Sequence, residues 1–151
     1  MRIGTAEATH YGDEEYETVL FNGTPSYITD LEGAFRRAHR ALRHGGSIVV
    51  ADVPKESSYA MLYMLGAQLG GWSHPLLDGI KPRIVYPIEF ARSARWRTTR
   101  EKVTVLLATE FDRVTYAQTL TPHPVYSNDV DEEPEEGYSR GDYVAIRAEK
   151  L

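Results

Sequence analysis

The chain has 151 residues, of which 42% are hydrophobic and 26% charged, and it contains no cysteine. This length suffices for one globular domain and is short for two. The lack of cysteine excludes disulfides, thiolate zinc sites and cysteine nucleophiles. The most continuous apolar stretch, residues 59–69, falls short of the roughly 18 residues of a membrane-spanning helix. With no signal-like start either, we expect a cytoplasmic protein without membrane contacts.

The formal net charge of −5 comes from one acidic segment. Six acidic side chains lie between residues 129 and 136, and without them the chain would carry +1. Their spacing lacks the glycine and bidentate glutamate of a calcium loop, which favours a solvated loop. Arginines gather at 36–43 and 92–100, but the acidic pI and the absence of a recognised binding motif favour solvated helix faces over a nucleic-acid surface.

The first part of the chain has the pattern of strand, helix and strand. Residues 17–21 form a β-branched and aromatic run that ends in the turn residues 22–25. A capping box of Thr29 and Glu32 predicts a helix over 30–44, which Gly45-Gly46 would end. Residues 47–53 are apolar without alternation, as in a strand that is covered on both faces. These elements predict a right-handed parallel crossover.

The second part is less regular. Ser57 or Ser58 could cap a helix that runs to Leu69, and residues 72–86 are expected to be loop with room for a short strand. A helix is predicted over 87–96, and another begins at a second capping box, Thr98-Thr99-Arg100-Glu101. Residues 113–120 and 142–148 are predicted to be strands of an antiparallel hairpin, joined by an acidic loop over 121–141.

Four segments follow one another in a recognisable order. They are residues 4–8 (Gly-Thr-Ala-Glu-Ala) with the strand at 16–20, the loop 21–28, the Gly-Gly turn within 38–52, and residues 106–114. In this order they resemble the C-terminal part of a class I S-adenosylmethionine-dependent methyltransferase, of the small-molecule type typified by ubiquinone and menaquinone biosynthesis enzymes.

The resemblance implies an α/β fold: a Rossmann-like methyltransferase sheet, incomplete at its N-terminal side, with a C-terminal antiparallel hairpin. Residues 1–151 would form one partial domain, in which 54–86 provide the acceptor pocket or lid. The sequence contains no Gly-x-Gly, the turn that lets the family's backbone approach the cofactor, and Thr5 stands where the family commonly has aspartate. The resemblance therefore covers about the C-terminal two-thirds of a usual domain.

The missing part has a structural consequence. In the family's sheet the first strand lies beside the fourth, which corresponds to residues 18–21 here. Without that neighbour, the strand would be an unpaired apolar edge. We therefore expect the chain to form a homo-oligomer, such as a dimer, or to be completed by a separate N-terminal segment.

The resemblance also implies a cofactor, S-adenosylmethionine, and residues that would bind it. Asn22 and Gly23 follow a parallel strand at its carboxyl end, where ligands bind in such sheets, although the same residues could form a plain turn. Phe21 would pack on the cofactor or serve as ordinary core. The segment matching the adenine site contributes Thr5, Ala6 and Glu7.

Methyl transfer from a sulfonium mainly requires alignment of donor and acceptor, and a base only where the acceptor must lose a proton. Tyr27 could orient an acceptor or cover the start of the following helix. His10 and His74 are base candidates, or solvated loop histidines. Asp52 ends its strand on the crevice side, or caps the next turn. No histidines have metal-ligand spacing, so no metal site is expected.

Three functions remain open at this point. The first is S-adenosylmethionine-dependent methyl transfer to a small-molecule acceptor, which would require a missing N-terminal segment or partner chain. The second is a degenerate relative that acts as an interaction module without catalysis. The third is an unrelated α/β domain with a coincidental Gly-Gly turn.

Overall fold

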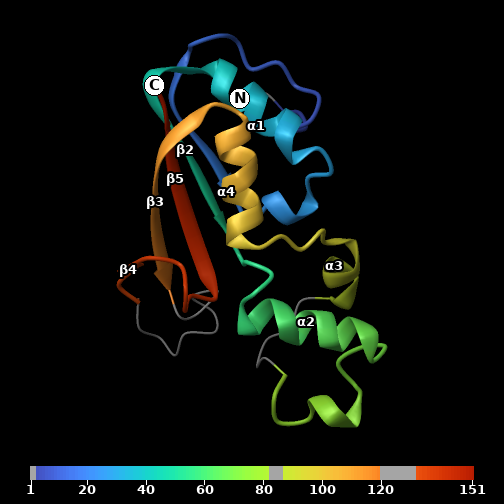
Figure 1. Ribbon diagram of the computed structural model, residues 1–151. Coiled ribbons are helices and arrows are strands. Elements are labelled where there is room, and N and C mark those ends of the chain that lie inside the picture. The colour runs from blue at the N-terminus through green and yellow to red at the C-terminus, as the bar shows by residue number, and fades with distance from the viewer. Residues whose placement is uncertain (1–2, 82–86, 120–131) are drawn as a thin grey trace.

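The computed structural model describes residues 3–81, 87–119 and 132–151, and a five-stranded sheet organises them (Figure 1). The strands lie in the order β1–β2–β5–β3–β4, with β1 and β2 parallel and the other neighbours antiparallel. Their bounds are Tyr16–Asn22 (β1), Leu42–Asp52 (β2), Phe111–Thr119 (β3), Glu135–Glu136 (β4) and Tyr143–Lys150 (β5). This order confirms the predicted α/β class, the parallel crossover and the C-terminal antiparallel hairpin.

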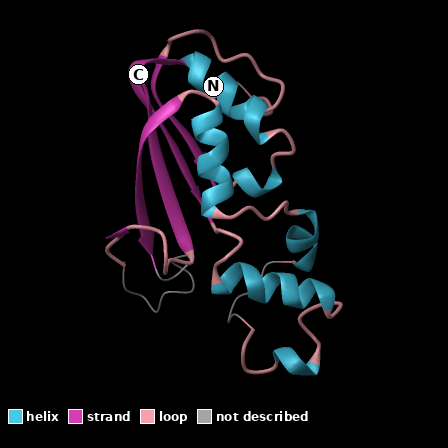
Figure 2. Cartoon of the chain, in the orientation of Figure 1, coloured by secondary structure: helices cyan, strands magenta, loops and turns pink. Residues whose placement is uncertain are grey.

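Two helices, α1 (Leu31–Ala41) and α4 (Thr99–Ala108), cover one face of the sheet (Figure 2). The core lies between them and the strands, where apolar burial supplies most of the driving force for folding. Its fully buried members include Phe35, Leu42, Ile48, Leu106 and Ile146.

Side chains on the opposite face of the sheet have no helix over them in the described part of the chain (Figure 2). Strand register places Leu20, Val49, Arg147 and Thr115 in one row across this face. Leu20 is 62% exposed. Because β1 is also the outermost strand, the predicted unpaired apolar edge is present in the described sheet.

The start and end of α1 differ from the prediction. Asp30 caps the helix by accepting a hydrogen bond from the Gly33 amide (2.8 Å), whereas Glu32 forms an ion pair with Arg36 (2.7 Å). The predicted Thr29–Glu32 capping box is therefore wrong. The shorter Asp30 side chain reaches the free amides directly, which leaves Glu32 to its i+4 neighbour.

The helix also ends at Ala41 and not at residue 44, because Leu42 is already extended and fully buried in β2. Gly45 has a positive φ of 74° and lies within β2. The pairing of β1 with β2 jumps there from Tyr16↔Leu42 to Thr18↔Ser47. The Gly-Gly pair thus serves a bulge in the strand and does not terminate the helix.

A smaller lobe follows β2. It comprises α2 (Ser58–Gln68), the 3-10 helix η2 (Pro75–Leu77) and α3 (Ile88–Ser93), and it lies beyond the carboxyl ends of β1 and β2 (Figure 1). We call these elements the α2–α3 lobe. Ser57 caps α2 by accepting from the Ala60 amide (3.0 Å), which confirms one of the two predicted caps.

One further prediction for this region needs correction. α3 is shorter than the predicted helix 87–96, because Ala94 is extended and the Arg95 amide donates to the Ser26 carbonyl (2.6 Å). Residues 72–81 contain no strand, and residues 82–86 lie outside the described part.

The second capping box is confirmed, since Thr98 and Glu101 satisfy each other's backbone amides at the start of α4. The acidic loop is not wholly irregular: Glu135 and Glu136 form β4 beside β3, and Glu135 also pairs with Arg140. Residues 120–131 lie outside the described part. Within the described residues, no helix has the length and apolar character needed to span a bilayer.

Candidate functional site

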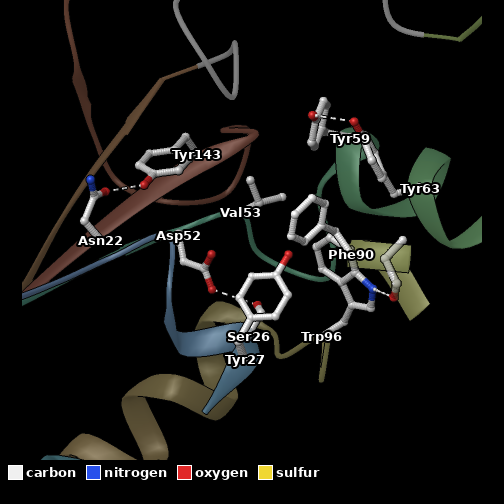
Figure 3. A pocket seen from close by; sticks show the side chains of 12 residues that line it. Asn22, Ser26, Tyr27, Asp52, Val53, Tyr59, Tyr63, Phe90, Trp96 and Tyr143 are labelled. Carbon is white, nitrogen blue, oxygen red and sulfur yellow. Dashed lines mark hydrogen bonds between the residues drawn. The ribbon is translucent and has the colours of Figure 1, made fainter. Parts of the chain in front are cut away.

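A cavity of about 360 Å³ opens where β1 and β2 end (Figure 3). It is walled mainly by aromatic side chains, and its lining residues are Asn22, Gly23, Ser26, Tyr27, Asp52, Val53, Tyr59, Tyr63, Phe90, Ala91, Trp96 and Tyr143. We call it the aromatic cavity. The carboxyl ends of adjacent parallel strands are the usual place for ligands in α/β sheets.

The fold brings these residues together from both halves of the molecule. Parallel pairing aligns Asn22 with Ala51, so the ends of β1 and β2 open on the same side. Gly23, at φ +62°, turns the chain into the 3-10 helix η1 (Pro25–Tyr27), which carries Ser26 and Tyr27. The α2–α3 lobe contributes the opposing rings of Tyr59, Tyr63 and Phe90 (Figure 3).

Asp52 is the charged group of the aromatic cavity. It is 5% exposed; its Oδ2 accepts a hydrogen bond from Ser26 Oγ (2.8 Å) and forms an ion pair with the buried Lys102 ammonium (3.1 Å). Its Oδ1 accepts no hydrogen bond from the described residues. Asp52 therefore does not cap the next turn, and one carboxylate oxygen is left for the cavity.

The pKa values of two tyrosines are raised near this carboxylate. Burial, and then the Asp52 charge, raise the pKa of Tyr143 to about 12. Burial also raises the pKa of Tyr27, again with contributions from Asp52 and from Tyr63. The Tyr143 hydroxyl donates to Asn22 Oδ1 (2.5 Å), which ties β5 to the loop after β1. Both phenols are thus neutral near pH 7.

The turn that carries Tyr27 is held by Arg97. Its guanidinium donates to the carbonyl oxygens of Pro25 (2.6 Å) and Ile28 (2.8 Å), and burial lowers its pKa. These carbonyls belong to the short helix η1 and its C-terminal cap, and the last turn of η1 contains no basic residue of its own. Arg97 therefore fixes the position of Tyr27 from outside the aromatic cavity.

A second cavity, of about 660 Å³, runs along the outer edge of β1. Thr5, Ala6, Glu7 and Phe21 line it together with residues of α1, and Tyr27 borders both cavities. We call it the edge cavity. Of the six predicted cofactor residues, these four lie along the edge cavity, whereas Asn22 and Gly23 lie in the aromatic cavity.

Two of these residues also have structural contacts. Glu7 Oε1 accepts from the amides of Thr29 (2.7 Å) and Asp30 (2.8 Å), which anchors the N-terminal segment to the start of α1. The Phe21 ring packs edge to face on Phe35 at 5.4 Å, so it is core as well as cavity wall. Both interpretations of Phe21 are therefore compatible with its position.

The two predicted histidines lie elsewhere. His10 borders a third cavity, of about 220 Å³, with Arg37 and Arg40. His74 Nδ1 accepts from the Leu76 amide (3.2 Å) and begins η2. Neither lines the aromatic or the edge cavity, so the structure brings Tyr27 together with Asn22 and Gly23 but not with the histidines. The described residues contain no cluster of three potential metal ligands.

Sequence reasoning missed several residues of the site. Lys102 was predicted only as part of a helix, yet it is 2% exposed and bound to Asp52. Phe90, Trp96 and Tyr143 have no local pattern that marks them as cavity walls. The one usable signal was the resemblance, which implied an acceptor pocket in 54–86, a segment that contains Tyr59 and Tyr63.

Comparison with known proteins identifies the fold of this chain. No family model matches the chain. An uncharacterised protein of Methanocaldococcus jannaschii is 24% identical over 149 residues, which are 99% of this chain and 63% of that protein. A methyltransferase from Thermotoga maritima, described as S-adenosylmethionine-dependent and a "possible histamine N-methyltransferase", is 28% identical with a TM-score of 0.78. The match covers 98% of this chain and 62% of that structure.

More distant structures have the same fold. An S-adenosylmethionine-dependent methyltransferase of Methanosarcina mazei has a TM-score of 0.59 at 13% identity. The match covers 99% of this chain and 66% of that structure. The geranyl diphosphate C-methyltransferase of Streptomyces coelicolor, solved with S-adenosylhomocysteine, has a TM-score of 0.59 at 14% identity. This match covers 99% of this chain and 53% of that structure. The chain thus has the Rossmann-like fold of class I S-adenosylmethionine-dependent methyltransferases, and spans under two-thirds of the first two relatives.

Proposed function

We propose that this chain forms the acceptor site, and one wall of the donor site, of an S-adenosylmethionine-dependent methyltransferase that acts on a small molecule. The observation that carries the proposal is the aromatic cavity, which meets the Asn22-Gly23 loop at the carboxyl ends of two parallel strands. The similarity to the Thermotoga maritima methyltransferase supports the same reaction class.

The residues present fit S-adenosylmethionine in part. The edge cavity offers an apolar wall at Phe21 and polar groups at Thr5 and Glu7, which suit an adenine ring. The backbone at Gly23 is open, since nothing lies within 4 Å of where a Cβ would be. The chain has no glycine-rich turn to cradle the rest of the molecule. We therefore assign Thr5, Ala6, Glu7, Phe21, Asn22 and Gly23 to one wall of the donor site.

When bound, S-adenosylmethionine supplies an electrophilic methyl group on a sulfonium. The chain's own residues would orient the acceptor and exclude water. Tyr27 borders both cavities, and its raised pKa keeps the hydroxyl protonated, so it can donate a hydrogen bond to an acceptor. The rings of α2 and α3 exclude water from the same space. Tyr59 and Tyr63, from the predicted segment 54–86, thus form the acceptor wall together with Phe90. Roles for His10 and His74 as bases stay predictions.

The free edge of β1 requires a partner in this proposal. Leu20 is exposed beside the edge cavity, and the chain spans 62% of the Thermotoga maritima structure. A parallel strand that pairs with β1 would occupy its free edge and close the donor site, and the segment that carries this strand would cover Leu20 on the adjoining face. We propose that a further polypeptide segment, equivalent to the part of the relatives outside the match, supplies this strand.

The test is complementation. The part of the Thermotoga maritima protein outside the match is produced as a separate chain and mixed with this one, and S-adenosylhomocysteine binding is measured by calorimetry. We expect binding by the mixture and much weaker binding by either chain alone. Leu20→Asp should abolish the complex, whereas Leu107→Asp, at a leucine of α4 that is 53% exposed, should not.

Three other outcomes would change the conclusion. A stable complex that binds no S-adenosylhomocysteine would favour an interaction module without catalysis. Self-association of this chain that Leu20→Asp prevents would show a second copy at the β1 edge. Failure of the two chains to associate, with a monomeric chain that binds no S-adenosylhomocysteine, would overturn the proposal.

A further inference from the structure

The aromatic cavity has an unusual combination of walls and charge. Six of its lining residues carry aromatic rings: Tyr27, Tyr59, Tyr63, Phe90, Trp96 and Tyr143. Among the lining residues in the described part of the chain, Asp52 bears the single formal charge, and it is negative. Figure 3 shows the rings converging around Asp52 and Val53 from separate elements. Aromatic faces and a carboxylate both attract positive charge.

The orientation of Asp52 directs its charge into the cavity. Lys102 and Ser26 both bind Oδ2, so the neutralising ammonium sits at one oxygen and Oδ1 accepts nothing from the described residues. Lys102 belongs to α4 and does not line the cavity. Arg97, the other nearby cation, is turned away to the carbonyls of Pro25 and Ile28.

Two tyrosines of the cavity wall lie near this charge. Asp52 helps to raise the pKa of Tyr27 on one side and of Tyr143 on the other. The cavity therefore combines aromatic walls with one negatively charged lining group.

From this geometry we infer that the aromatic cavity binds a small organic ammonium ion, with the cation against the aromatic faces and near Asp52 Oδ1. The inference rests on the proposed methyl transfer only for the ligand's role as acceptor. The acceptor would then be an amine, and its bound ammonium form would lose a proton to solvent before the neutral nitrogen takes the methyl group. The binding itself needs no methyl donor.

Other ligand classes fit less well. An anionic acceptor would meet the Asp52 carboxylate, and no cationic side chain lines the cavity in the described residues. A neutral apolar molecule would fill the space between the rings but would leave Asp52 Oδ1 without a partner, which costs free energy in a buried site. A volume of about 360 Å³ suits a molecule of modest size.

Choline and its neutral isostere 3,3-dimethyl-1-butanol test the charge preference, because they share a shape and differ by one positive charge. Affinities for the full chain are measured by ligand-observed NMR titration. We expect choline to bind at least about tenfold more tightly. Equal affinities, or no binding of choline, would overturn the inference.

Variants locate the site. Phe90→Leu keeps an apolar side chain without the ring and should weaken choline binding several-fold more than alcohol binding. Tyr138→Leu is the matched control, at an exposed ring that packs on Tyr116 outside the cavity.

Asp52→Asn with Lys102→Met removes both charges of the buried pair and should abolish the preference for choline. An unchanged preference in a folded double variant would contradict the role of Asp52.

A competition measurement separates this inference from the proposed function. In the complemented protein, S-adenosylhomocysteine should not displace choline if the aromatic cavity is the acceptor site. Displacement would show that the donor occupies the cavity and would overturn the acceptor assignment. Choline binding without any S-adenosylhomocysteine binding would support the cation site while removing the methyltransferase proposal.

Discussion

The sheet half and the α2–α3 lobe are stabilised differently. In the sheet half, the side chains of four strands and two helices form one continuous core with many fully buried members. The lobe has a small separate cluster of Tyr63, Ile88 and Ala91, with aromatic rings packed around it. The smaller cluster buries less apolar surface, so the lobe is expected to open more easily.

The aromatic cavity lies at the boundary between these halves. The sheet half contributes Asp52 and Asn22 on rigid strands, and the lobe contributes Tyr59, Tyr63 and Phe90. The Asp52 carboxylate, at the end of β2, therefore faces aromatic side chains of the lobe that is expected to open more easily. This division suits a site in which the sheet side sets the chemistry and the lobe side admits different acceptors.

The largest effect is expected at the buried ion pair that ends β2. Lys102→Met leaves the Asp52 charge without its ammonium and should lower the free energy of unfolding by about 3 kcal/mol or more. Chemical denaturation measures this change. Adding Asp52→Asn should recover most of the loss. A double variant as unstable as the single one would show that Lys102 acts through packing.

A matched pair of leucines tests the comparison directly. Leu106 in the sheet half and Leu77 in the lobe are both 0% exposed. Leu106→Ala should destabilise the whole molecule by about 3 kcal/mol, because the large core cannot collapse around the lost side chain. Denaturant unfolding followed by circular dichroism would show one transition shifted to a lower midpoint.

Leu77→Ala should have a smaller effect on global unfolding, at about 2 kcal/mol or below, and a larger one on local opening. Hydrogen exchange should rise in α2 and α3, with the sheet amides unchanged. Equal loss of protection in both halves would mean that the molecule unfolds as one unit and that the lobe has no stability of its own.

The smallest effect concerns Tyr143 at high pH. Its pKa is raised from 10.0 to about 12, so the neutral phenol favours the folded state. This contribution is complete below pH 10 and is lost as the pH rises through about 12. The stability difference between the wild type and Tyr143→Phe should therefore narrow over this range. A difference that stays constant from pH 9 to above pH 12 would contradict the shift.

Local signals predicted most elements of the fold, and failed where distant contacts decided the outcome. Thr98 and Glu101 form the predicted capping box, because a cap depends only on residues three apart. The end of α1 was misplaced because Leu42 is drawn into the sheet beside Tyr16. A Gly-Gly pair looks the same in a helix stop and in a strand bulge.

The candidate site was predictable in part for the same reason. Asn22 and Gly23 follow a recognisable strand, so their place at its carboxyl end could be expected. The pairing of Asp52 with Lys102 joins residues fifty positions apart, and no local pattern reveals it. The histidines were chosen by residue type, and their positions depend on how the loops fold.

The sequence by itself determined the order of strands and helices and the parallel crossover, because hydrophobic periodicity and turn residues act over short distances. The apolar edge at 18–21 followed from the resemblance to a family whose sheet has a further strand there. Only the tertiary structure decided that Tyr27, Phe90 and Tyr143 surround one carboxylate. They come from elements far apart along the chain, and the packing of the lobe against the sheet brings them together.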